Sequence, residues 1–190
     1  MNLPFNDKPV ETLIEQNLIR EGTVLDLRLK YIGDGGMEYL AKCPDLVDLR
    51  ELNLERNDIT DKGINILAKS TIVTGLKSLN LERNSISDDG ARLIAQSTNF
   101  SHLVSLNFWK NNIEAEGAKA IANSLILINL ERLDLAQNRI SDEGGRALAE
   151  SQTLTALKYV DLFGNGISEE VQAAIKESSN FKSIQHLVLE

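Results

Sequence analysis

The chain has 190 residues but only one cysteine, Cys43, and two histidines, so it cannot form an intrachain disulfide or a zinc site of ordinary spacing. Its first residues lack the basic start and apolar core of a signal peptide, and no apolar stretch is long enough to span a bilayer. Basic residues are outnumbered, and the net charge of −8 disfavours nucleic acid or an anionic membrane surface as a partner.

Catalytic motifs are also missing. The sequence contains no phosphate-binding loop, dinucleotide-binding fingerprint, hydrolase nucleophile elbow or metalloprotease motif. Acids recur at Asp61, Asp88 and Asp142, but these positions favour helix starts over acid–base chemistry. A metal site built from Asp134 and Asp161 is the weaker alternative. We therefore expect no catalytic residue, no cofactor and no bound metal, and we interpret Cys43 as a small buried residue.

A repeated pattern dominates what is present. The motif L-x-x-L-x-L-x-x-N-x-I recurs six times at a spacing of 27 residues, without an insertion or deletion. Such a fixed period predicts a solenoid in which each repeat buries its apolar face against its neighbours. Three positions mark the register: the second Leu (Leu25, Leu52, Leu79, Leu106, Leu133, then Val160 and Leu187), the Asn (Asn57, Asn84, Asn111, Asn138, Asn165, with Lys30 in the first copy) and the Ile (Ile32, Ile59, Ile86, Ile113, Ile140, Ile167).

The remainder of each repeat predicts a helix and a return loop. A Ser or Thr followed by an acid, as in Thr60-Asp61, suits a helix N-cap. A Gly follows, where we expect a larger side chain to collide with the next repeat, and then a helical stripe ending in Ala. We expect the Asn side chain to bond backbone groups where the strand bends away. Each repeat is thus predicted to be strand, turn, helix and loop.

These motifs resemble the ribonuclease-inhibitor-like class of leucine-rich repeat proteins, from about Ile19 to the C-terminus. The resemblance implies an α/β fold: a right-handed solenoid or horseshoe with a parallel sheet on the concave side and helices on the convex side. Secreted leucine-rich repeat proteins commonly carry disulfide-bonded caps, which one cysteine cannot provide, so we expect a cytoplasmic protein. Short uniform repeats also resemble those of bacterial effectors delivered into host cells.

The two ends are expected to differ. Residues 1–22 are predicted to be an N-terminal cap, with a helix from Pro9 to Arg20 closed by Gly22. Residues 23–190 hold six full repeats and the start of a seventh, in one solenoid domain. The last strand would leave an apolar edge, so we expect either a longer natural chain or an edge covered by another chain, self-association included.

The residues that the repeat does not dictate suggest a binding site. Alternate strand residues share a face, which gives three rows on the concave side. The first is Val24, Glu51, Ser78, Ser105, Arg132, Tyr159; the central row is Asp26, Asn53, Asn80, Asn107, Asp134, Asp161; the third is Arg28, Glu55, Glu82, Trp109, Ala136, Phe163. Two strand spacings place Trp109 and Phe163 about 10 Å apart, with a solvent-facing Ala136 between them.

We therefore expect a non-catalytic protein-binding module. The predicted partner-binding residues are Trp109, Phe163, Tyr159, Arg132, Ala136, Asp134, Asp161, Glu55 and Glu82, because aromatic and Arg side chains dominate interface energetics. A simpler alternative is that Trp109 and Phe163 only shield the neighbouring strand. Two other functions stay open: a regulator of a partner enzyme, such as a GTPase activator, and the substrate-recognition part of a larger protein, such as a ligase.

Overall fold

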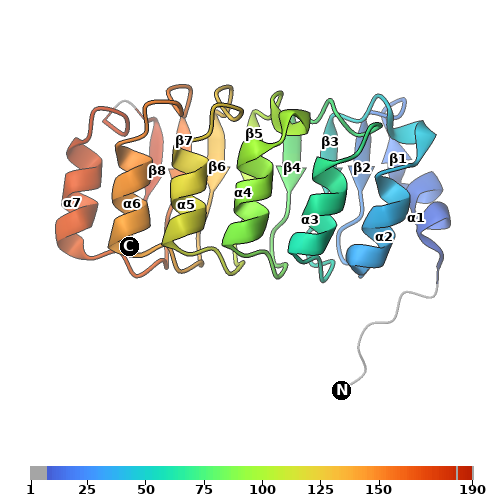
Figure 1. Cartoon of the computed structure of the whole chain (residues 1–190), viewed down its shortest axis with the longest axis horizontal. Helices are drawn as coiled ribbons and strands as arrows, with labels where there is room; N and C mark the ends of the chain where they lie inside the picture. Colours follow the sequence, from blue (N-terminus) through green and yellow to red (C-terminus); the bar gives the residue numbers. More distant parts are fainter. Residues whose placement is uncertain (1–7, 183, 190) are drawn as a thin grey trace, which may run out of the picture.

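The computed structural model describes residues 8–182 and 184–189, which form a single row of repeats (Figure 1). All strands belong to one open sheet whose strand order follows the chain from β1 to β8. The repeat helices stand side by side over one face of this sheet, and no helix of the described residues covers the other face (Figure 1). We call this second face the open sheet face. The predicted α/β solenoid with a parallel sheet is thus confirmed.

The strands have the register that the sequence predicts. Leu25 pairs with Leu52, Leu52 with Leu79, and the same offset continues along the sheet. Each parallel strand is only three residues long, and from β2 to β7 the chain turns toward its helix after the second core Leu. The parallel strands are β2 (Val24–Asp26), β3 (Glu51–Asn53), β4 (Ser78–Asn80), β5 (Ser105–Asn107), β6 (Arg132–Asp134), β7 (Tyr159–Asp161) and β8 (His186–Val188).

The repeat helices follow strands β2 to β7 one by one, and each buries an apolar stripe, which ends near an Ala in α2 to α6. Among the described residues, no helix is long and apolar enough to cross a membrane. Two short 3-10 helices, η1 (Pro44–Leu46) and η2 (Thr98–Phe100), lie in the return loops. The repeat helices are α2 (Gly33–Leu40), α3 (Asp61–Ala68), α4 (Asp88–Gln96), α5 (Ala115–Ala122), α6 (Ser141–Ala149) and α7 (Glu169–Glu177).

The N-terminal segment differs from the expected single helix. Helix α1 (Val10–Asn17) ends before Arg20, and β1 (Leu18–Ile19) follows it and pairs antiparallel with β2. The reason is that β2 would otherwise leave a row of backbone donors and acceptors unpaired at the sheet edge. Gly22, with φ +84°, lies in the turn between β1 and β2 and does not close the helix. Residues 1–7 of the predicted cap lie outside the described residues.

The Asn row is structural, as the sequence predicted. The Asn84 amide nitrogen donates to the carbonyl of Leu54 in the preceding repeat at 2.9 Å. Its Oδ1 accepts from the backbone N–H groups of Asn57 and Ile59 at 3.1 and 3.0 Å. One side chain thereby satisfies backbone groups of two repeats, which a core without water requires.

The Gly that recurs in the repeat helices is needed for a contact with the preceding repeat, not with the next one as expected from the sequence. A Cβ on Gly90 would lie 2.4 Å from Oδ1 of Asp61, which belongs to the repeat before, and 2.6 Å from Cγ2 of Ile86. Cys43 is buried in the slot that holds Ser70 one repeat later, and burial raises the pKa of its thiol. The interpretation of Cys43 as a small core residue is therefore confirmed.

Candidate partner-binding surface on the open sheet face

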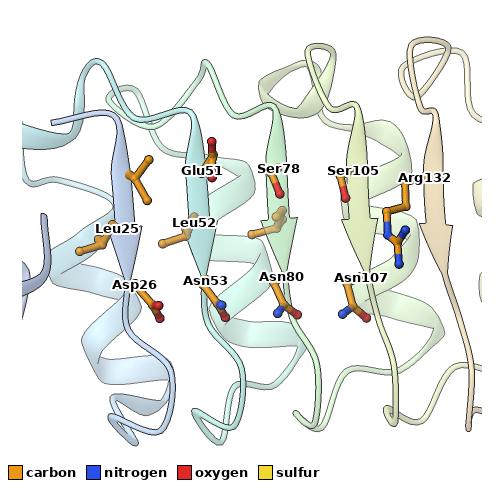
Figure 2. Close-up of a pocket in the computed structure, with 12 residues that line it drawn as sticks. Leu25, Asp26, Glu51, Leu52, Asn53, Ser78, Asn80, Ser105, Asn107 and Arg132 are labelled. Atoms are coloured by element: carbon orange, nitrogen blue, oxygen red, sulfur yellow. The ribbon is translucent and has the colours of Figure 1, made fainter. Parts of the chain in front are cut away.

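The open sheet face carries the three predicted rows of side chains. The leucines point into the core, whereas the residues around them stand on the other face of the strand. Figure 2 shows Glu51, Ser78, Ser105 and Arg132 at the start of their strands, and Asp26, Asn53, Asn80 and Asn107 at the end. Because the strands are parallel and in register, each row runs straight across the sheet.

The central row has a structural function that the sequence analysis missed. In every repeat its Oδ1 accepts a hydrogen bond from the backbone N–H two residues later, which fixes the bend after the strand. Asn and Asp make this turn better than Ser and Thr, whose hydroxyls form it more weakly, so the repeat favours Asn or Asp in this row. The pairs are Asp26–Arg28, Asn53–Glu55, Asn80–Glu82, Asn107–Trp109, Asp134–Ala136 and Asp161–Phe163. The repeat does not decide between Asn and Asp, and this chain has carboxylates at positions 26, 134 and 161 of the row.

Trp109 and Phe163 lie around one hollow of about 310 Å³. Phe163 is 48% exposed, and Trp109 is half-buried. The structure brings together five of the predicted binding residues in this hollow, and Gln137 and Val188 complete its lining. The hollow, named here the aromatic hollow, is lined by Trp109, Asp134, Ala136, Gln137, Asp161, Phe163 and Val188.

Ala136 does not face the solvent as expected. Only 4% of it is exposed, because a methyl group between two large side chains and over a strand exit has little surface left. The space between Trp109 and Phe163 therefore lies above Ala136, which forms its floor. A Trp at 136 would displace packed neighbours, so filling the hollow in this way would not leave folding intact.

The side of Trp109 away from the hollow is already occupied. The Arg83 guanidinium lies 4.7 Å from the centroid of the Trp109 ring, and Arg83 also pairs with Glu82 at 3.5 Å. Burial and the neighbouring Glu55 raise the pKa of Glu82. Glu55 and Glu82 therefore lie on the β3–β4 side of Trp109 and do not line the aromatic hollow, although both were predicted to share its site.

Arg132 and Tyr159 flank the hollow without lining it. The Arg132 guanidinium stacks on the Tyr159 ring, with 3.6 Å between Cζ and the ring centroid. The Tyr159 hydroxyl donates to Oδ2 of Asp161 at 3.2 Å, and the Tyr159 ring lies 6.3 Å from that of His186. This chain of contacts holds Asp161 at the edge of the hollow.

Asp134 is a half-buried carboxylate whose pKa is raised. Burial raises the pKa of its carboxyl, and the neighbouring Asp161 raises it further, whereas the Ala136 N–H and Arg132 lower it. The two aspartates are register partners on β6 and β7. Their negative charges therefore lie on adjacent strands in a partly desolvated place, which is unfavourable until a positive charge arrives.

A second hollow, of about 280 Å³, lies toward the N-terminal end of the open sheet face (Figure 2). It is lined mainly by small polar side chains of the first and central rows, among them Ser78, Ser105, Asn53 and Asn80. The sequence analysis did not single it out. The signal was present, because the first row carries Ser at 78 and 105 between the larger Glu51 and Arg132, and small residues between large ones leave a depression.

Comparison with known proteins agrees with this architecture. The family model described as Leucine Rich repeat matches residues 47–65, 75–95, 101–122 and 127–149. The four matched segments follow the register of 27 residues, so leucine-rich repeats are shown within residues 47–149. Such domains generally mediate protein–protein interaction, and the family is typically a non-catalytic binding scaffold. No curated protein matches the chain.

Three of the solved structures with some similarity to this chain are receptors or receptor ectodomains. One is the ectodomain of the receptor kinase GASSHO1/SCHENGEN3 from Arabidopsis thaliana in complex with CASPARIAN STRIP INTEGRITY FACTOR 2, with 21% identity over 78% of this chain and a TM-score of 0.39. A TDR receptor has 13% identity over 80% and a TM-score of 0.36. The plant peptide hormone receptor RGFR1 in complex with RGF2 has 19% identity over 80% and a TM-score of 0.34. This chain spans 19%, 32% and 30% of those three chains, respectively.

Proposed function

We propose that this chain is a non-catalytic module that binds a protein partner on its open sheet face, with the aromatic hollow as the anchor point. The observation that carries the proposal is the pair Trp109 and Phe163 around one hollow, with nearly half of Phe163 exposed. The repeat pattern does not require an aromatic residue at either position, since the same row holds Arg28, Glu55 and Glu82 elsewhere. Aromatic residues in a partly desolvated depression are typical anchors of protein interfaces.

We also propose the repeat subclass, the extent of the binding unit and its location. We take the repeats as the ribonuclease-inhibitor-like class, because each strand from β2 to β7 is followed by a full α-helix of eight or nine residues. Residues 23–190 would act as one binding unit with residues 1–22 as its cap, in the cytoplasm of its own cell or of a host cell. No contact in the described residues favours a GTPase regulator or a ligase subunit over a plain binding module.

The test is a selection of binders from a phage-displayed library of random peptides. The wild-type chain is compared with a variant carrying Trp109→Ala and Phe163→Ala. A matched control carries Leu125→Ala and Ile128→Ala, which remove large exposed apolar side chains outside the aromatic hollow, 78% and 50% exposed in the wild type. We expect the wild type and the control to enrich one family of peptides, and the aromatic variant to lose it. Equal enrichment by all three would contradict the proposal.

A further inference from the structure

The aromatic hollow combines two kinds of side chain that rarely line an apolar anchor site. Trp109 and Phe163 supply aromatic surface, and Asp134 and Asp161 supply two carboxylates in the same depression. An aromatic ring has a negative face that attracts cations, so both kinds of side chain present negative electrostatic potential to an occupant. The chain as a whole carries a net charge of −8.

The carboxylates keep acceptor capacity after their internal hydrogen bonds are counted. Oδ1 of Asp134 accepts from the Ala136 N–H at 3.1 Å, and Oδ1 of Asp161 accepts from the Phe163 N–H at 3.0 Å. Oδ2 of Asp161 accepts from the Tyr159 hydroxyl. Within the described part of the chain, Oδ2 of Asp134 has no hydrogen-bond partner and neither aspartate forms a salt bridge, although a carboxylate can accept several donors.

Two cations near the hollow already have other contacts. Arg132 stacks on Tyr159, and Arg83 contacts Trp109 and Glu82. Arg83 follows β4 and the hollow is lined from β6, β7 and β8, on the other side of β5 in the strand order. The surface of Trp109 toward the hollow is therefore available to a second cation.

An apolar occupant would be a poor match for this lining. It would remove water from Asp134 and Asp161 without returning a donor, and a buried carboxylate without a partner is strongly unfavourable. We propose that the aromatic hollow receives a lysine or arginine side chain of the protein partner, with its aliphatic stem against Trp109 and Phe163 and its charge on Asp134 and Asp161. This inference rests on the proposed function.

The spacing of the two aspartates fits a single cation. They are register partners on adjacent strands, which lie about 4.8 Å apart. One ammonium or guanidinium group between them can donate to both carboxylates and cancel their mutual repulsion. The raised pKa of Asp134 agrees with this arrangement, because burial and Asp161 disfavour its charged form when the hollow holds no cation.

The variant that tests the inference carries Asp134→Asn and Asp161→Asn. The central row itself contains Asn at 53, 80 and 107, and each of these accepts the same backbone hydrogen bond. The variant therefore keeps the bend after each strand and loses only the two charges. A control with Asp48→Asn and Asp89→Asn removes two charges from side chains that are 71% and 73% exposed elsewhere, so that net charge is matched.

The probe is the peptide family that the wild-type chain enriches from the random library. We expect a Lys or Arg at one fixed position of the family. Affinity of such a peptide should fall about ten-fold for the Asp134→Asn, Asp161→Asn variant and stay unchanged for the control. Replacing the basic residue of the peptide by Met should cause the same loss in the wild type and no further loss in the variant.

The possible results separate the two proposals. A family anchored by an apolar residue, lost with Trp109→Ala and Phe163→Ala but unaffected by the Asp→Asn changes, would overturn the inference and leave the proposed function in place. A basic residue whose contribution does not depend on Asp134 and Asp161 would also overturn it. If the wild type enriches no peptide, both proposals fail.

Discussion

The Ser87 hydroxyl donates a hydrogen bond to Oδ2 of Asp61, 2.6 Å away in the preceding repeat. The other oxygen of Asp61 accepts from the backbone N–H groups of Ser87 and Gly90 at 2.9 and 3.0 Å. An acid at the start of one helix thus also caps the start of the next helix. Asp34 makes the same three contacts with the following repeat, and Asp142 bonds Ser168 through its N–H and its hydroxyl.

This contact predicts a stability effect that a single-helix cap would not have. Asp61→Ala should lower the free energy of unfolding by about 1–3 kcal/mol, because three donors of the next repeat lose their acceptor. Asp89→Ala removes an exposed carboxylate from the first turn of α4. Among the described residues this carboxylate bonds Arg92 of the same helix, so the substitution should lower the free energy of unfolding by less than about 0.5 kcal/mol. Denaturant unfolding of both variants measures the difference. Equal effects would show that the contact between repeats contributes nothing.

An acid that bonds the start of the next repeat stands at Asp34, Asp61, Asp88 and Asp142, but the equivalent position in α5 holds Ala115. This difference predicts a stabilising substitution. Ser141, which should be capped from position 115, has φ +58° instead of the extended conformation of Ser87. Ala115→Asp should restore the missing acceptor and raise the unfolding free energy by about 1 kcal/mol. In the wild type, Ser141→Gly should also stabilise, because Gly adopts positive φ without strain. When Ala115→Asp is present and Ser141 acts as the cap, Ser141→Gly should no longer stabilise the protein. Thermal unfolding of the variant with both Ala115→Asp and Ser141→Gly measures this.

The Asn row predicts a separation of stability from binding. Asn84→Ala should cost about 1–3 kcal/mol, because the Leu54 carbonyl and the Asn57 and Ile59 N–H groups lose their partner. Asn84 does not line the aromatic hollow, so the folded variant should bind the selected peptides as the wild type does. An unchanged melting curve with lost binding would mean that the Asn row is a binding row.

The fold could be predicted from the sequence because one register repeats without interruption. Each Leu, Asn and Ile recurs 27 residues away in the neighbouring repeats. The assignment of strand and helix in one repeat is therefore supported by the same assignment in the others. The N-terminal cap could not be predicted in the same way. The end of α1 at Asn17 and the pairing of Ile19 with Val24 depend on the exposed edge of β2, which has no counterpart in the repeats.

The sequence could predict where the candidate site lies, but not the contacts and the burial of its side chains. The alternation of strand residues places Trp109 and Phe163 on the open sheet face. It cannot tell that Arg83 stacks on Trp109, since that contact depends on rotamers in the turn after β4. Nor can it tell that Ala136 is buried, or that the central row serves the backbone, because both follow from how the chain bends after each strand.

The raised pKa of Asp134 predicts a pH-dependent stability. A carboxyl whose folded pKa lies above its unfolded value favours the folded state most at pH below the unfolded pKa, and this contribution is lost as pH rises through the folded pKa. Asp134→Asn should therefore raise the melting temperature relative to wild type near neutral pH. The difference should vanish below the ordinary Asp pKa, about 3.9. If the difference in melting temperature stays constant with pH, the negative charge of Asp134 does not destabilise the folded state.

The central claim, that a partner enters the aromatic hollow, can be tested through Trp109, the single tryptophan of the chain. Its emission reports on the surroundings of the Trp109 ring, so no label is needed. Titration with a peptide selected on the wild type should change the intensity or wavelength of this emission in a saturable way, with the same dissociation constant as calorimetry. Phe163→Ala should weaken both signals together. Saturable binding by calorimetry with unchanged Trp109 emission would place the partner elsewhere and contradict the account.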